Sequence, residues 1–469
     1  MTALEMHDVV VTHAGRRLVD VPHLRVGPDR PVTIVGESGS GKSLLAHALM
    51  GTLASTLEVD GKVDIGGRLL PLAERGNRRA LWGSEVAMLP QEPALALDPT
   101  MRVGRQVAEG VLGATRETAR TRAAAALASV GLPGASRTFP HTLSGGMAQR
   151  VAYAAATVGG ARVLVVDEPS KGLDPASVDR LAELLLRHVV DGGLLLTITH
   201  DLRLAAALGG EVAVMRDAEV LESGEAAQVL ERPRHDYTRR LVAAAPERWR
   251  HPWQRTGWET TAEPLVEATG LAKAYGSQQL FADLDVRVRP GERVALSGPS
   301  GVGKTTLGGA LLRIVAPDAG RVVHHDSLRG RVQKLYQDPA LSFPTLVPIE
   351  VGLRDVVKRH GADPRRLDQL VADLRLAPEL LTRRPAEVSG GELQRVAIAR
   401  MLLARPRLVL ADEATSRLDL LTQETTIDAL VRGLDDDAAL LVVTHDSALA
   451  DAVADTHLHL SGGDGQDAT

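Results

Sequence analysis

Gly36-Glu37-Ser38-Gly39-Ser40-Gly41-Lys42-Ser43 is the segment that decides the fold, and Gly298-Pro299-Ser300-Gly301-Val302-Gly303-Lys304-Thr305 repeats its pattern in the second half of the chain. Both segments match G-x-x-x-x-G-K-[ST]. Each follows a short β-type stretch (31–35 and 293–297) and precedes a helical run (44–50 and 306–314). A glycine-rich loop between a strand and a helix is the context in which this motif binds nucleotide phosphates.

The residue types in these loops predict how a nucleotide would be held. Glycines allow backbone N–H groups to turn inward around phosphate oxygens, and the following helix N-terminus adds positive potential. Lys42 and Lys304 are expected to reach the β- and γ-phosphates. Ser43 and Thr305 are expected to place a hydroxyl on Mg²⁺, and Thr306 extends the second binding segment. The predicted cofactors are therefore ATP and Mg²⁺.

Three further motifs occur twice in the same order. Leu-Ser-Gly-Gly-Met (143–147) recurs as Val-Ser-Gly-Gly-Glu (388–392), Val-Val-Asp-Glu (165–168) as Leu-Ala-Asp-Glu (410–413), and Thr-His-Asp (199–201) as Thr-His-Asp (444–446). Short Val/Leu-rich stretches at 162–166, 194–199, 407–411 and 439–444 suit buried parallel strands, whereas 177–191 and 422–433 have helical spacing. The sequence predicts a duplicated α/β fold with helices on both faces of each sheet.

A pair of carboxylates follows one apolar strand in each half. Asp167 and Asp412 end strands in which a carboxylate is otherwise unfavourable, and a phosphate-bound Mg²⁺ explains their presence. Glu168 and Glu413 are predicted to orient or polarise the attacking water. The alternative is that one carboxylate of each pair caps a loop.

Ring side chains complete each predicted nucleotide site. His200 and His445 lie at the same spacing after the aspartates, and we assign both contact with the γ-phosphate. Tyr275 and His13 lie equally far before their glycine loops, where an aromatic ring can stack on adenine. An imidazole offers less stacking area than a phenol ring. The first site is therefore expected to hold ATP less tightly, unless His13 is simply a surface loop residue.

The Ser-Gly-Gly motifs precede Gln149-Arg150 and Gln394-Arg395, and the motifs in this order resemble those of ATP-binding cassette (ABC) proteins over nearly the whole chain. The resemblance implies two P-loop NTPase cassettes, each a mostly parallel sheet core with an antiparallel β edge and an α-helical subdomain. It also implies that Gln91 and Gln337 are Q-loop glutamines and that Asp174 and Asp419 are D-loop aspartates. The implied Mg²⁺ ligands and sensors are Ser43, Gln91, Asp167, Thr305, Gln337 and Asp412.

In ABC proteins each nucleotide is held between two cassettes arranged head to tail. A Ser-Gly-Gly turn at a helix N-terminus is a second anion cradle. Ser144, Gly145 and Gly146 would then face the γ-phosphate at Lys304. Ser389, Gly390 and Gly391 would face the one at Lys42. This implies an intramolecular pseudo-dimer with two competent sites.

The repeat predicts a first ATP-binding domain at 1–245, a linker at 246–264, a second domain at 265–462 and a disordered tail at 463–469. Trp249, Trp253 and Trp258 gather in the linker. They indicate either an aromatic strap that docks on a domain or partner, or an ordered linker.

Composition limits the functions open to the chain. No cysteine occurs among its 469 residues, which excludes thiolate zinc sites and cysteine-ligated iron–sulfur clusters. The net charge of −5 gives no basic signature, so no nucleic-acid partner is expected. We find no run of about 18 apolar residues and no signal peptide, and expect a protein that does not itself cross a membrane.

Pro-Arg-His-Asp-Tyr-Thr (233–238) after the first cassette, and 139–147 around its Ser-Gly-Gly motif, resemble the importer ATPases for oligopeptides, dipeptides and nickel. In the second copy, 384–391 and 412–420 resemble the second ATPase subunit of nickel and metallophore importers. The resemblance implies a fusion of two ATPase subunits at the cytoplasmic face of the membrane. Its partners would be two permease subunits, contacted through 92–140 and 338–385, and an extracellular solute-binding protein. The alternatives are a soluble tandem ATPase of translation or DNA repair, and the ATPase of an energy-coupling-factor importer for vitamins or cobalt.

Overall fold

The structure, a computed structural model, describes residues 3–91, 96–170, 173–249, 253, 261–276, 278–299, 301–416 and 418–461. The chain divides into two compact units, Met1–Ala243 and Ala244–Thr469. The tail predicted at 463–469, Trp258 and most of the predicted linker lie outside the described residues.

The first unit contains one mixed sheet of ten strands. From edge to edge the strands are β5 (Arg68–Pro71), β4 (Glu58–Ile65), β1 (Leu4–His13), β2 (Arg16–Val26), β10 (Glu219–Glu225), β9 (Glu211–Arg216), β3 (Val32–Val35), β8 (Leu194–Thr199), β7 (Val163–Asp167) and β6 (Val86–Leu89). The run from β9 to β6 is parallel, whereas β1, β2, β4 and β5 pair antiparallel. This confirms the expected parallel core with an antiparallel edge.

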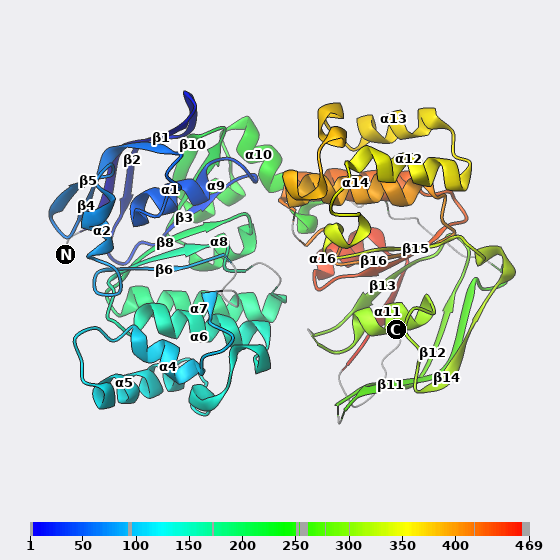
Figure 1. Ribbon diagram of the computed structural model, residues 1–469, viewed down its shortest axis with the longest axis horizontal. Coiled ribbons are helices and arrows are strands. Elements are labelled where there is room, and N and C mark those ends of the chain that lie inside the picture. Colours follow the sequence, from blue (N-terminus) through cyan, green and yellow to red (C-terminus); the bar gives the residue numbers. More distant parts are fainter. Residues whose placement is uncertain are drawn as a thin grey trace. The chain divides into compact units, whose positions relative to one another are not determined.

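Helices cover both faces of this sheet. They are α1 (Lys42–Met50), α2 (Arg75–Arg79), α4 (Val103–Glu109), α5 (Arg116–Ser129), α6 (Gly145–Thr157), α7 (Pro175–Val190), α8 (Leu202–Leu208), α9 (Ala226–Glu231) and α10 (Asp236–Ala243), with short 3-10 turns at Ala135–Arg137 and Pro140–Thr142. Figure 1 shows α4 to α7 on one side of β6 and β8, with α1 on the other side.

Strand alternation explains why both faces are buried. Along β7, Leu164 and Val166 pack into the core formed with α4 to α7, while Val163 and Val165 pack into the core formed with α1. Successive side chains of a strand point to opposite faces, so a strand buried on both sides reads as a continuous apolar run.

The second unit divides its strands between two sheets. β12 (Gln278–Val288), β11 (Val266–Tyr275) and β14 (Ala319–His324) form an antiparallel sheet, and β15 (Val332–Leu335), β16 (Leu408–Asp412), β17 (Ala439–Val443), β13 (Arg293–Ser297) and β18 (Thr456–His459) form a parallel one.

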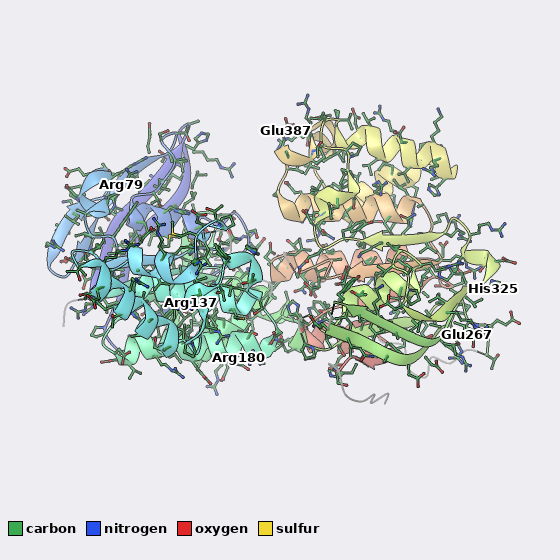
Figure 2. All side chains as sticks on the ribbon, turned by 60° about the horizontal axis from the view of Figure 1, so that its bottom comes forward. Arg79, Arg137, Arg180, Glu267, His325 and Glu387 are labelled. Carbon is green, nitrogen blue, oxygen red and sulfur yellow. The ribbon has the colours of Figure 1, made fainter. Side chains whose placement is uncertain are left out.

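The helices of the second unit repeat the plan of the first. They are α11 (Lys304–Leu311), α12 (Ile349–His360), α13 (Pro364–Asp373), α14 (Gly390–Leu403), α15 (Leu420–Gly433) and α16 (Ser447–Val453), with 3-10 turns at Pro246–Arg248, Asp326–Leu328, Pro339–Ser342, Pro378–Thr382 and Pro385–Glu387. Within this unit α12, α13 and α14 lie on one side of β15 and β16 and α11 on the other (Figure 1). In Figure 2, Glu387 marks the helical side, and Glu267 and His325 lie with the antiparallel sheet.

The tryptophan segment belongs to the second unit. Trp249 and Trp253 are buried in the core built by α12 to α15, and their rings meet edge to face with centroids 5.0 Å apart. Trp253 Nε1 donates a hydrogen bond to Asp428 of α15 at 2.9 Å. Of the two interpretations, the described part of the segment therefore fits the strap docked on a domain.

Candidate functional site

Both glycine-rich loops require glycine for steric reasons. A Cβ on Gly36 would lie 2.0 Å from the carbonyl oxygen of Met215, and one on Gly298 would lie 2.4 Å from that of Leu460. Gly41 and Gly303 cap the N-termini of α1 and α11 in the left-handed conformation, with φ of 101° and 105°. Only glycine adopts such a backbone without strain. The helices therefore begin at the lysines, two residues earlier than the sequence pattern predicted.

The two loop lysines are buried and turned into their own loops. Lys42 Nζ donates to the carbonyl oxygens of Gly36 and Glu37 at 2.9 and 2.6 Å, and to Ser40 Oγ at 3.3 Å. Lys304 Nζ donates to the carbonyl oxygens of Gly298 and Pro299, both at 2.8 Å. Each ammonium group thus lies inside the loop where phosphate binding is predicted. Ser300, also predicted in the second loop, lies outside the described residues.

The predicted Mg²⁺ ligands meet in both units. Ser43 Oγ donates to Asp167 Oδ1 at 3.0 Å, and Thr305 Oγ1 donates to Asp412 Oδ1 at 2.7 Å. Mg²⁺ favours oxygen ligands and binds through one or two protein groups together with phosphate oxygens and water. A hydroxyl beside a carboxylate fits that requirement. Among the described residues, no cluster of three or more His, Cys, Asp or Glu offers an all-protein metal site instead.

Glu168 and Glu413 adopt a strained backbone. Their φ angles are 47° and 48°, in the left-handed region that non-glycine residues rarely occupy. Their backbone N–H groups donate to the carbonyl oxygens of Ile198 and Val443 at 2.7 and 3.0 Å. Such strain persists only where the surroundings enforce it, and it is concentrated at functional sites.

In the first unit Glu168 is held by His200. His200 Nδ1 lies 2.7 Å from Glu168 Oε2, which also accepts from the His200 N–H at 3.2 Å and from Thr199 Oγ1 at 3.4 Å. Because Nδ1 faces the glutamate, a contact with the γ-phosphate would use Nε2. That contact remains a prediction.

Burial and pairing shift the pKa values of three charged groups at the first site. Burial raises the pKa of Asp167, although the hydrogen bond from Ser43 opposes the shift. Burial alone would also raise the pKa of Glu168, but the hydrogen bond and positive charge of His200 lower it. Burial alone would lower the pKa of His200, but its bond to Glu168 raises it. Both shifts favour the charged forms of the Glu168–His200 pair.

The second unit distributes the same contacts differently. Glu413 Oε1 lies 3.6 Å from His445 Nδ1, while Glu413 Oε2 accepts from Gln337 Nε2 at 2.7 Å. The interaction with His445 lowers the pKa of Glu413. Gln337 thus contacts the glutamate, and its role at the metal and nucleotide stays a prediction. Gln91 is exposed at the end of the described segment 3–91.

The remaining predicted residues take up matching positions in the two units. His13 and Tyr275 are both the exposed last residues of the first strand of their units, β1 and β11. Ser144 and Ser389 cap α6 and α14, accepting from Met147 N and Glu392 N, each at 3.3 Å. The glycines Gly145, Gly146, Gly390 and Gly391 form the first turns of these helices, with backbone N–H groups at the helix N-termini.

Asp174 and Asp419 have a local structural task. Asp174 Oδ1 accepts from Ser177 N at 2.9 Å, and Asp419 Oδ1 accepts from Thr422 N at 3.0 Å. They are the N-caps of α7 and α15. N-capping satisfies a backbone donor that the helix leaves unpaired.

Sequence reasoning missed a residue at the first phosphate loop. Tyr237, in the segment 233–238, is buried, and its hydroxyl accepts from the backbone N–H of Glu37 at 3.1 Å. The guanidinium of Arg216 lies 4.8 Å from the ring centroid. The segment was recognised as a family signature, but nothing in the local sequence places α10 against a loop 200 residues earlier.

Two phosphate loops, each with a hydroxyl–carboxylate pair and a strained glutamate, define a tandem P-loop ATPase. The family model described as ABC transporter matches residues 19–171 and 281–416. The chain therefore belongs to the ABC transporter family, as a tandem of two ATP-binding domains. This confirms the predicted family, fold and ATPase activity.

Curated relatives and solved structures match nearly the whole chain. It is 32% identical to the peptidoglycan transport ATP-binding protein YejF of Agrobacterium fabrum, over 96% of this chain and 89% of the relative. It is 31% identical to the glutathione import ATP-binding protein GsiA of Escherichia coli K12, over 96% and 83%. The RNase-L inhibitor structure matches 97% of this chain and 88% of its own at 24% identity, with a TM-score of 0.66. The structure of an archaeal ribosome recycling factor, aABCE1, in complex with stalk protein aP1 also matches 97% of this chain and 88% of its own. Its sequence identity is 24% and its TM-score is 0.67. At this identity these two structures support the fold alone.

Proposed function

We propose that this chain hydrolyses Mg·ATP to energise import of a peptide-type substrate through partner permeases. The observation that carries the proposal is the likeness to YejF and GsiA, two import or transport ATP-binding proteins, along nearly the full length of this chain. Within the described residues no helix is long and apolar enough to cross a membrane. The translocation path would then come from partner subunits.

Each site residue has a task in the proposed hydrolysis. Lys42 and Lys304 neutralise charge that develops on the γ-phosphate, which is the main catalytic need in phosphoryl transfer. Ser43 with Asp167, and Thr305 with Asp412, would hold Mg²⁺, which would supply positive charge to offset the charge of the phosphates. Glu168 and Glu413, with lowered pKa values, are ionised at neutral pH and accept a hydrogen bond from the attacking water.

The two Ser-Gly-Gly turns are proposed to complete the sites of the opposite units. Ser144 would act with the Lys304 site, and Ser389 with the Lys42 site. Hydrolysis would then remove the phosphate that bridges the units and let them separate, a change of contacts that could drive a permease.

The proposed permease surface lies on the helical segments that follow Gln91 and Gln337. In the second unit Leu341, Leu346 and Val351 are exposed by 69%, 77% and 41%. Apolar side chains exposed together on a protein are typical of an interaction site. The segment 92–95, where the first predicted surface begins, lies outside the described residues.

The substrate class is tested by uptake. A strain that lacks this chain should lose ATP-dependent uptake of labelled di- and tripeptides, and the parent chain should restore it. A chain with both Glu168→Gln and Glu413→Gln should be produced at parental level and fail to restore it. Normal peptide uptake together with impaired ribosome recycling would instead favour the non-transport alternative.

A further inference from the structure

The strands that lead to the two Q-loop glutamines differ in charge at one position. In the first unit Met88 of β6 pairs with Val165 of β7. In the second, Lys334 of β15 pairs with Leu410 of β16. Both partners lie two residues before the predicted Mg²⁺ aspartate of their unit. Lys334 therefore occupies the structural position that a half-buried methionine holds in the first site.

Lys334 reaches the predicted Mg²⁺ carboxylate. Its Nζ lies 2.9 Å from Asp412 Oδ2, and the side chains of the pair are only 13% and 8% exposed. The ring of Tyr336 lies beneath the same ammonium group, 5.1 Å away. Because Asp412 Oδ1 accepts from Thr305, both carboxylate oxygens of Asp412 are engaged.

We propose that Lys334 is a cation built into the second nucleotide site, where it weakens Mg²⁺ binding and makes nucleotide binding less dependent on Mg²⁺. The inference rests on the proposed Mg²⁺ role of Thr305 and Asp412. A positive charge on the metal's carboxylate ligand both competes for an oxygen and repels the incoming ion. The same charge offsets part of the repulsion between the phosphates and Asp412 when Mg²⁺ is scarce.

The first site has an apolar neighbour instead. Met88, which pairs with Val165 two residues before Asp167, carries no charge, so this strand position supplies no cation to the first site. The inference therefore makes the two sites of one chain unequal in the Mg²⁺ concentration that they need, although their loop, carboxylate and histidine residues match.

The ion pair could instead serve only to neutralise a buried carboxylate. In that case removal of Lys334 would lower stability, because it leaves an unpaired buried charge, and would not shift the Mg²⁺ requirement. The test therefore measures metal-dependent binding rather than turnover.

The experiment isolates the second site with Lys42→Ala and follows equilibrium binding of a fluorescent, non-hydrolysable ATP analogue while Mg²⁺ is titrated from EDTA upward. In this background Lys334→Met should lower the Mg²⁺ concentration at half-saturation about tenfold, the order expected for removal of a nearby unit charge. It should also weaken analogue binding in EDTA. Lys334→Arg, which keeps the charge, should retain the midpoint of the Lys42→Ala parent.

The reciprocal variant provides a second, independent arm if Lys334→Met fails to fold. Met88→Lys in a Lys304→Ala background should raise the Mg²⁺ midpoint of the first site. An unmoved or oppositely shifted midpoint, with Mg²⁺ dependence intact, overturns the inference alone. If analogue binding at the second site of the Lys42→Ala parent shows no Mg²⁺ dependence, the proposed Mg²⁺ site is itself overturned and the inference with it.

Discussion

The same residue types make different contacts in the two units. Glu168 contacts both the ring and the backbone N–H of His200. The two carboxylate oxygens of Glu413 instead face different residues, His445 and Gln337. A carboxylate bonded on one side by a histidine keeps its remaining lone pairs available for a water. The glutamates are therefore the residues whose change should separate binding from hydrolysis.

Glu168→Gln and Glu413→Gln should each slow hydrolysis at their own site, and together they should reduce phosphate release by about 10²–10⁴-fold, the usual contribution of a positioned general base. ATP binding should persist, because the lysines and Mg²⁺ ligands remain. Phosphate release and nucleotide binding are measured on the same preparations, with Glu117→Gln at the exposed start of α5 as control. Vigorous turnover by the double variant would show that these glutamates were misassigned.

The Glu168–His200 pair predicts a pH-dependent stability. The stability from Glu168, whose pKa is lowered, is present above its ordinary pKa and is lost as pH falls through the lowered one. The stability from His200, whose pKa is raised, is present below its ordinary pKa and is lost as pH rises through the raised one. His200→Gln should therefore cost about 1–3 kcal/mol near pH 5–6.5 and progressively less above the raised pKa.

Thermal denaturation from pH 5 to pH 8.5 checks this window. The control is Gln369→Ala, a change of a residue that does not titrate, in α13. A difference between parent and His200→Gln that stays constant with pH would contradict the assigned pair.

At the scale of elements, two segments that lie outside the repeated motifs contact distant parts of their own units. α10 presents Tyr237 to the first phosphate loop. Trp249 and Trp253 pack in the core built by α12 to α15, where Trp253 bonds to Asp428. From secondary structure alone, without the side-chain contacts, both segments would be taken for simple connections between domains.

Tyr237→Phe should weaken nucleotide binding at the first site by about three- to tenfold, the size expected when one hydrogen bond is removed. The hydroxyl fixes the backbone of Glu37, and thereby the loop that surrounds the phosphate. Binding is measured in a Lys304→Ala background, in which only the first site is intact. The matched control is Tyr153→Phe, whose hydroxyl donates to Leu184 away from the loop. Equal affinity for Tyr237→Phe and parent would remove the proposed support.

Trp253→Ala should destabilise the second unit by about 3–5 kcal/mol, as large-to-small changes at buried aromatic sites do. The side chain loses both its core packing and the bond to Asp428. Chemical denaturation of the second unit expressed as 244–469 measures the effect. A fragment that begins at 265 should lose comparable stability. If it is as stable as 244–469, the tryptophan segment contributes nothing to the fold.

At the scale of the whole molecule, the proposal that each site is shared between the units makes an asymmetric prediction. Lys42→Ala with Ser389→Arg damages one shared site twice and should leave trapping of nucleotide by orthovanadate at the other. Lys42→Ala with Ser144→Arg damages both shared sites and should abolish trapping. Both serines are exposed N-caps of equivalent helices, and Ser389 also donates to Glu392 in a capping box, so the stability of each variant is measured alongside trapping. The opposite pattern would mean that each unit uses its own Ser-Gly-Gly turn.

The sequence by itself determined the duplicated α/β fold, the two phosphate loops and the Ser43–Asp167 and Thr305–Asp412 pairs. Their signals are local, because a strand, a glycine-rich turn and a helix lie within a few residues. In each unit, buried parallel strands then bring that unit's motifs to one edge of its own sheet. The observed helix boundaries differ only slightly from the predicted ones. α11 ends at Leu311 rather than at 314, because the backbone of Arg313 is in the left-handed region.

Only the tertiary structure decided which residues hold the site residues in place. The pairings of Tyr237 with Glu37, of Lys334 with Asp412 and of Trp253 with Asp428 join segments whose sequence separation carries no periodic or motif signal. The same holds for the different contacts of Glu168 and Glu413, each of which follows an aspartate in the sequence, Asp167 or Asp412. Such contacts depend on side chains from several strands and helices packing together, and that packing exists only in the folded chain.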